Sequence, residues 1–148
     1  MVVAQGTALC LYVRREIRSL TSTDLDTYIN TLYTLYTTPN EVGKELYGAD
    51  FENSSYILRH HYFNAAQHDN DHIHEGNGFL MQHVKIANVV DQSLLLIDPR
   101  ESLPYWDYTL DAVQNGLRHD LSPVLQTKTF GESLFLSAVP SKFHSVII

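Results

Sequence analysis

The chain has 148 residues, of which 44% are apolar and 18% charged, so it is long enough for one domain with a packed core. Its formal net charge of −7 argues against nucleic acid or an anionic membrane surface as a partner. No apolar run is long enough to span a bilayer, and the first residues lack the basic start of a signal peptide. The single cysteine, Cys10, cannot form an internal disulfide.

The first helix is predicted over residues 22–37. Thr21 suits its N-cap, and Asp24 stands three residues later in a capping-box-like pair. Apolar side chains then recur at helical spacing until Pro39, which cannot continue the helix. The next stretch, residues 40–54, contains two glycines and is expected to be a loop.

Two further helices are predicted over residues 53–67 and 78–97. The second of them carries apolar residues and one histidine along a single helical stripe: Phe79, His83, Ile86, Val90 and Leu94. From Asp107 onward glycines and prolines are spread along the chain, and a less regular region is expected. The predicted fold is therefore mainly α, with a loop-rich C-terminal tail.

Histidine is concentrated in one part of the chain. Six of the eight histidines lie within 24 residues: His60, His61, His68, His72, His74 and His83. Histidine is only intermediate in its preference for burial, and it is the commonest metal ligand in proteins. His74 stands at the entry to the helix whose inner face carries His83, so the two rings can converge on one ion. The pattern predicts a metal site.

These residues also carry a resemblance to a known family. His74 and His83 are separated by eight residues and a Phe79–Leu80 pair precedes the second histidine, while Leu103-Pro104-Tyr105-Trp106-Asp107 follows further along. The combination resembles the first copper-binding half of tyrosinases and haemocyanin-type proteins, from about Arg14 to Asp111. It implies a copper ion, and family members are often secreted.

The resemblance implies three histidine ligands, His61, His74 and His83. Spacing along the second helix leaves His60 and His61 equally open as the first ligand. The resemblance favours His61, because two aromatic residues follow it, as they follow the first ligand in the family. A three-histidine zinc site with a bound water fits the same residue count, although it leaves the Pro-Tyr-Trp-Asp segment unexplained.

The other polar residues of this region are expected to surround the ligands. Metal-bound histidine usually donates its second N–H to a carboxylate or a carbonyl, and Asp69, Asp71 and Glu75 are the candidates. His68 and His72 are expected to be exposed to solvent or to take part in this outer layer.

The family oxidises phenols or catechols to quinones with dioxygen at a pair of copper ions, so the implied partners are a phenolic small molecule and dioxygen. After Asp107 the chain has only His119 and His144, which lie 25 residues apart, so the second copper site is absent. We therefore expect residues 14–148 to be the N-terminal part of such a domain, an incomplete tyrosinase-like helical bundle. The alternatives are a non-catalytic copper- or zinc-binding fragment and a haemocyanin-like oxygen-binding module.

Several positions depart from the family pattern. Val84 stands where an arginine is usual, Val90-Asp91 replaces a Phe-Glu pair, and His72 occupies a position that is cysteine in some members. With the second half absent, apolar side chains such as Ile86, Val90 and Leu94 are expected to stay partly exposed. Such a surface predicts self-association, and a homodimer would be one way to cover it.

Overall fold

The computed structural model describes residues 12–65, 71, 73, 74, 76–116, 121–126, 129 and 130, and this part of the chain is mainly helical, as predicted. Its helices are η1 (Ile17–Ser19), α1 (Ser22–Thr37), α2 (Asn40–Tyr47), α3 (Ser54–Ala65), α4 (Gly78–Ile97), α5 (Tyr108–Asn115) and η3 (Pro123–Leu125). Within it no strand forms, and no helix is both long and apolar enough to cross a membrane. The expected loop-rich tail lies largely outside the described residues.

Helix α1 forms where the capping residues predict it. The side chain of Thr21 accepts a hydrogen bond from the backbone N–H of Asp24, which satisfies one of the free donors of the first turn. The inner face of the helix buries Tyr28 and Leu35, the latter at 1% exposure. Burial raises the pKa of the Tyr28 hydroxyl, which stays protonated at ordinary pH.

The prediction of a loop over residues 40–54 is wrong for its first half, which forms helix α2. Gly43 lowers the helical propensity of this short segment, but tertiary contacts override it. A Cβ at Gly43 would lie 2.0 Å from a ring carbon of Phe51, so only glycine lets the fully buried ring pack against the helix. An ion pair of 2.9 Å between Lys44 and Glu52 holds the end of α2 to the same segment.

Asn53 determines where α3 begins. Its Oδ1 accepts from the backbone N–H of Tyr56 at 2.9 Å, and its Nδ2 donates to the carbonyl of Thr38 at 3.1 Å. Its own backbone N–H donates to Oδ1 of Asn40 at 2.7 Å. One side chain therefore caps α3 and ties it to the end of α1. The predicted helix over 53–67 is confirmed as far as Ala65.

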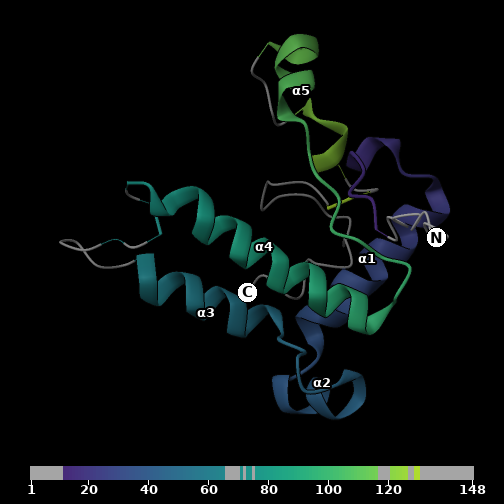
Figure 1. Ribbon diagram of the computed structural model, residues 1–148. Helices are drawn as coiled ribbons and strands as arrows, with labels where there is room; N and C mark the ends of the chain where they lie inside the picture. The colour runs from purple at the N-terminus through teal and green to yellow at the C-terminus, as the bar shows by residue number, and fades with distance from the viewer. Residues whose placement is uncertain are drawn as a thin grey trace, which may run out of the picture.

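Helices α3 and α4 run side by side in opposite directions, and α1 packs across both (Figure 1). The core lies where α1 meets the second half of α4. Leu94 is fully buried there, and Val90 packs against the same cluster. The expectation that Leu94 stays exposed is therefore wrong, because α1 covers this end of the stripe. Ile86, nearer the start of α4, is only half-buried.

Helix α5 corrects the expectation of irregular structure after Asp107. The Asp107 side chain accepts from the backbone N–H of Thr109 and caps the helix, and Gly116 ends it with a left-handed φ of 58°. The caps, rather than a long apolar stripe, define this helix of eight residues.

A buried carboxylate joins α5 to the rest of the fold. Asp111 has no exposed surface and accepts hydrogen bonds from Arg18 Nη1 at 2.8 Å, Trp106 Nε1 at 2.6 Å and Ser122 Oγ at 2.9 Å. These donors come from three separate segments of the chain. A buried charge is tolerated only when it is paired and hydrogen-bonded in this way.

We predict that Asp111→Ala lowers the free energy of unfolding by about 3–5 kcal/mol, because it leaves the Arg18 guanidinium without its buried partner. Chemical denaturation followed by circular dichroism measures the change. Asp26→Ala, an exposed position on α1, is the control and should change stability by less than about 0.5 kcal/mol. Equal stability of the two variants would contradict the role assigned to Asp111.

Candidate metal centre

Three histidines from three segments meet at the ends of α3 and α4. His61 lies on α3, His74 on the turn that follows it, and His83 on the second turn of α4. One ring nitrogen from each lies within 4.8 Å of the others. The expected grouping of these three histidines is therefore confirmed. They lie close enough together to bind one metal ion.

His83 is oriented by the helix that carries it. Its Nδ1 lies 2.8 Å from the carbonyl oxygen of Phe79, one turn earlier. A carbonyl can only accept, so Nδ1 carries the proton and Nε2 keeps the free lone pair. The ring of Phe79 lies beside the imidazole, with 4.4 Å between ring centroids. The backbone therefore selects the tautomer that a metal ligand requires.

His74 is oriented by Asp71 on the same turn. Asp71 Oδ2 lies 2.9 Å from His74 Nδ1, while its Oδ1 accepts from the backbone N–H groups of Ile73 and His74 at 2.8 Å each. The carboxylate thus fixes both the turn and the ring, and His74 Nε2 is left free. Of the three acids predicted for this role, Asp71 fills it; Asp69 and Glu75 lie outside the described residues.

The pKa of Asp71 reflects this arrangement. The hydrogen bond from the backbone N–H of His74, followed by the one from its ring, lowers the pKa to about 2. A lowered carboxyl pKa stabilises the folded turn above the ordinary Asp pKa of about 3.9. That contribution is lost as the pH falls toward 2. Asp71 is therefore ionised at every pH at which imidazole is neutral.

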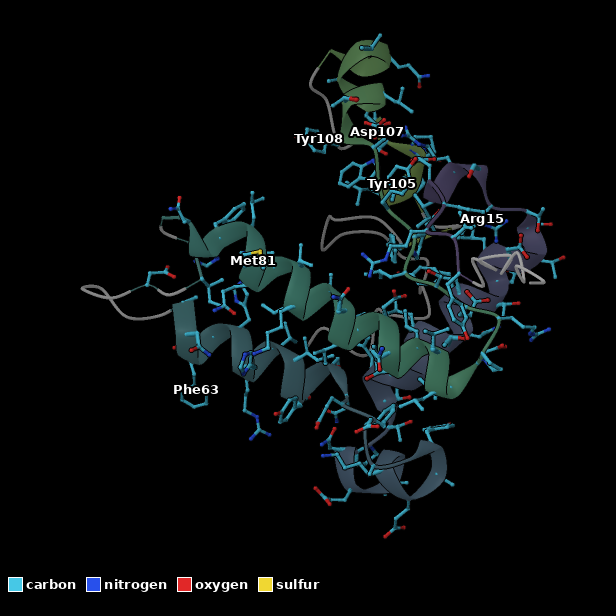
Figure 2. The ribbon with its side chains drawn as sticks, in the orientation of Figure 1. Arg15, Phe63, Met81, Tyr105, Asp107 and Tyr108 are labelled. Carbon is cyan, nitrogen blue, oxygen red and sulfur yellow. The ribbon has the colours of Figure 1, made fainter. Side chains whose placement is uncertain are left out.

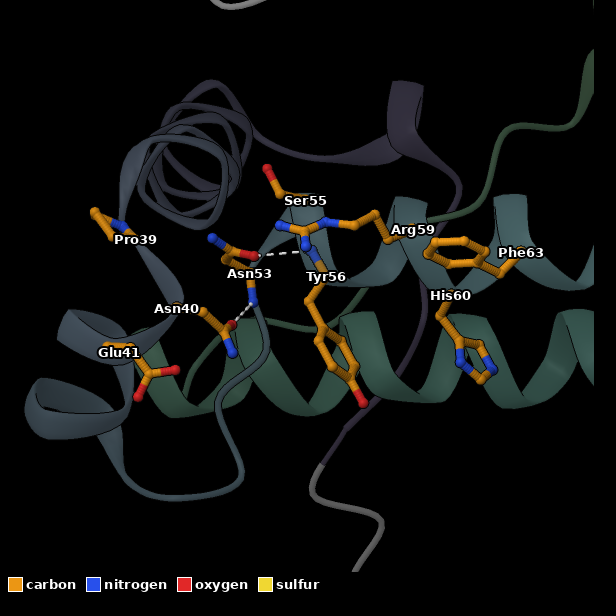
Figure 3. Close-up of a pocket in the computed structure, with 9 residues that line it drawn as sticks. All are labelled: Pro39, Asn40, Glu41, Asn53, Ser55, Tyr56, Arg59, His60 and Phe63. Atoms are coloured by element: carbon orange, nitrogen blue, oxygen red, sulfur yellow. Dashed lines mark hydrogen bonds between the residues drawn. The ribbon is translucent and has the colours of Figure 1, made fainter.

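The structure also separates His61 from its neighbour His60. The ring of His61 completes a triangle with the other two: its centroid lies 5.0 Å from that of His74 and 5.9 Å from that of His83, and the latter two are 5.6 Å apart. His60 lies on a different face of α3, next to Tyr56 (Figure 3). Neighbouring residues on a helix point about 100° apart, so only one of the two can face the cluster.

The geometry of the cluster suits an ion with an open position. Three nitrogens bound to one ion at 2.0–2.1 Å in trigonal or tetrahedral geometry lie roughly 3.3–3.6 Å apart. The ring nitrogens lie within 4.8 Å of one another, so the most distant pair must close by roughly 1 Å when an ion binds. The side chain of His74 is 45% exposed, and solvent therefore reaches one side of the cluster. Three ligands with an exposed side leave room for a fourth, exchangeable ligand.

The kind of donor atom in the cluster restricts which metals it can bind. It consists of three imidazoles, with no thiolate or carboxylate among the grouped residues. Imidazole suits copper, zinc, iron and nickel, whereas magnesium and calcium prefer oxygen ligands. The group is therefore a candidate transition-metal centre, and the distances alone do not choose the metal.

The Pro-Tyr-Trp-Asp segment lies away from this centre and has an architectural role. Figure 2 shows Tyr105 and Asp107 at the foot of α5, far from the ends of α3 and α4 where Phe63 and Met81 lie. The backbone of Tyr105 donates to the carbonyl of Arg15 and accepts from Ile17, each at 2.9 Å. The segment joins the start of the chain to α5 and contributes no ligand.

Asp91, which stands where the resembled pattern has a glutamate, is likewise part of the scaffold. Its Oδ1 accepts from the backbone N–H of Leu103 at 2.7 Å, and its Oδ2 pairs with Arg14 at 2.8 Å. The departures at Val84 and Val90 do not disturb the histidine cluster, since Val84 is exposed and Val90 packs toward the core. Some predicted residues lie outside the described part of the chain: Cys10, His68, His72, His119 and His144.

The carbonyl of Phe79 contributes to the site and was not expected from the sequence. The signal was present, because a histidine on a helix can reach the carbonyl four residues earlier. Comparison with family models, curated proteins and solved structures found no match to this chain. What is known of the site therefore comes from its own residues and their geometry.

We predict that Asp71→Asn weakens metal binding about 10- to 100-fold, because the turn loses its carboxylate and His74 its orienting partner. Competition with a chromophoric zinc chelator at pH 7.5 measures the affinity. Asp26→Asn removes the same charge from the outer face of α1 and should leave the affinity unchanged. If both variants bind zinc as the parent chain does, Asp71 does not orient the ligand.

Proposed function

We propose that this chain is a copper-binding protein of the tyrosinase and haemocyanin type that holds one copper ion through His61, His74 and His83. The observation that carries the proposal is that one ring nitrogen from each of these three histidines lies within 4.8 Å of the others. The motif residues around His74 and His83, together with the Pro-Tyr-Trp-Asp segment, support the same family.

The choice of copper rests on ligand chemistry as well as on resemblance. Among divalent metals of the first transition row, copper binds nitrogen ligands most tightly, and zinc binds them less tightly. Zinc is the second candidate, because three histidines with an exposed fourth position are also the ligand set of catalytic zinc sites. A copper site and a zinc site differ in which of the two metals binds more tightly, and a measurement of both affinities distinguishes them.

When bound, copper supplies one-electron redox chemistry at this position. The residues of the chain hold and orient the ligands: Asp71 keeps a proton on His74 Nδ1, and the Phe79 carbonyl keeps one on His83 Nδ1. The Phe79 ring is 43% exposed beside His83. It offers an apolar surface next to the open side of the site, which suits the ring of a phenol.

A phenol oxidase of this type needs two copper ions, and the described residues bring together ligands for one. The outer faces of α3 and α4 near the site expose large apolar side chains, which suits a second copy: Tyr62 at 67%, Phe63 at 68%, Leu80 at 70% and Met81 at 73%. We propose a homodimer as the route by which two such sites could act together.

We predict that the chain binds one copper ion per molecule and that His83→Ala removes most of the affinity. His60→Ala is the matched control, since it removes an adjacent imidazole that does not face the cluster, and it should bind as the parent chain does. Isothermal titration with Cu(II), with Zn(II) in a parallel experiment, measures both affinities. Equal losses from the two substitutions, or tighter binding of zinc than of copper, would contradict the proposal.

The same titration has a predicted pH dependence. Metal ligation needs neutral imidazoles, and free imidazole takes up a proton near pH ~6.5. Protons therefore compete with copper at lower pH, and the affinity should fall steeply below that value. An affinity that stays constant down to pH 5 would exclude histidine ligation.

We predict that the copper-loaded monomer does not oxidise catechols. One site can transfer only one electron at a time, whereas oxidation of a catechol to a quinone removes two. Quinone absorbance is followed with catechol and air over a range of protein concentrations. Activity proportional to the concentration of monomer would contradict the one-site proposal, whereas activity rising with its square would support the homodimer.

A further inference from the structure

Two cationic side chains have no ionic partner in the part of the chain that the structure describes. Seven lysines and arginines are described, and five of them form ion pairs. Arg59 on α3 and Lys85 on α4 form neither an ion pair nor a hydrogen bond with any described residue. In a chain with a net charge of −7, two such cations on neighbouring helices are an unusual feature.

Each of the two cations lines one of two hollows along α3 that share two lining residues. Lys85 lines an apolar hollow of about 170 Å³, whose walls are Tyr56, Ile57, His60, Lys85, Ile86 and Val89. Arg59 lines a wider hollow of about 630 Å³ that adjoins it (Figure 3). Tyr56 and His60 belong to both hollows and stand between them.

The smaller hollow has the size and lining of a site for one aromatic ring. A cavity of about 150 Å³ with aliphatic walls is enough to hold benzene. Here Ile57, Ile86 and Val89 provide the apolar walls, and all three are only half-buried within the protein. A bound ring would cover this apolar surface, which the fold leaves in contact with water.

The charges around the smaller hollow favour an anion. No aspartate or glutamate lines it, and Lys85 stands in its wall. Asp50 and Glu52 lie on the surface beyond Lys85, but Glu52 is already paired with Lys44 at 2.9 Å. An anionic group at the mouth of the hollow would meet the Lys85 ammonium group, which has no ionic partner among the described residues. Arg59 adds little net charge to this attraction, because Glu41 lines the same adjoining hollow.

We propose that this hollow binds a small aromatic carboxylate. The ring lies against Ile57, Ile86 and Val89, and the carboxylate pairs with Lys85. The site is separate from the metal centre, because none of His61, His74 and His83 lines it. The proposal therefore holds whichever metal the histidines bind.

Benzoate and its neutral analogue benzamide test the proposal on the full chain kept metal-free with EDTA. Saturation-transfer NMR titrations should show benzoate binding with a millimolar Kd and benzamide binding more weakly by up to about fivefold, since an exposed ion pair contributes up to this preference. Equal binding of the two compounds would overturn the role of charge. If benzoate does not bind at concentrations up to 20-fold above ~1 mM, the proposed site is wrong.

Substitutions then locate the site. Lys85→Gln should weaken benzoate binding about fivefold and leave benzamide unaffected, whereas Val89→Phe should fill the hollow and weaken both compounds. Arg100→Gln is the charge-matched control, because Arg100 pairs with Asp98 and lines neither hollow. Thermal unfolding confirms that each variant is folded. If Arg100→Gln weakens benzoate as much as Lys85→Gln does, the attraction comes from net charge and the proposed site is wrong.

Discussion

The anchoring of α4 is the constraint on which the candidate metal centre depends. Leu94 and Ser93 on its later turns are fully buried, and Ser93 Oγ accepts from the backbone N–H of Glu52 at 3.1 Å. This bond places the segment just before α3 against α4, so the antiparallel pair starts from a fixed point. His83 lies eleven residues before Leu94, about 16 Å along the helix. The packing of the later turns of α4 therefore sets the direction in which His83 points at the other end of the helix.

The two ends of the α3–α4 pair differ in how they are stabilised. The end near α1 is held by the hydrophobic core and by buried polar contacts such as those of Ser93 and Asn53. The end that carries the histidines has mainly local contacts, namely the Asp71 turn and the Phe79 carbonyl. Local hydrogen bonds do not cover apolar side chains, and those at this end, such as Met81, are exposed to solvent. A bound ion would join three segments there and so stabilise the less packed end by linkage.

The motif residues divide into two physical roles. His74 and His83 form part of the cluster, whereas Tyr105, Asp107 and Asp91 connect segments that lie far from it. The backbone bridge between residues 15–17 and Tyr105 joins the start of the described chain to α5. A short sequence pattern can therefore combine the ligands with the framework that supports them. The Pro-Tyr-Trp-Asp segment is part of this framework, which is why an interpretation that considers only the metal ligands does not account for it.

The sequence by itself determined the mainly helical fold, the positions of α1, α3 and α4, and the convergence of His74 and His83, because caps and helical periodicity are local properties. Only the tertiary structure decided what depends on neighbours distant along the chain. Helix α2 forms because Gly43 packs on Phe51, and Leu94 is buried because α1 crosses it. His61 rather than His60 joins the cluster because packing sets how far α3 is rotated toward α4, and periodicity within one helix contains no information on that rotation.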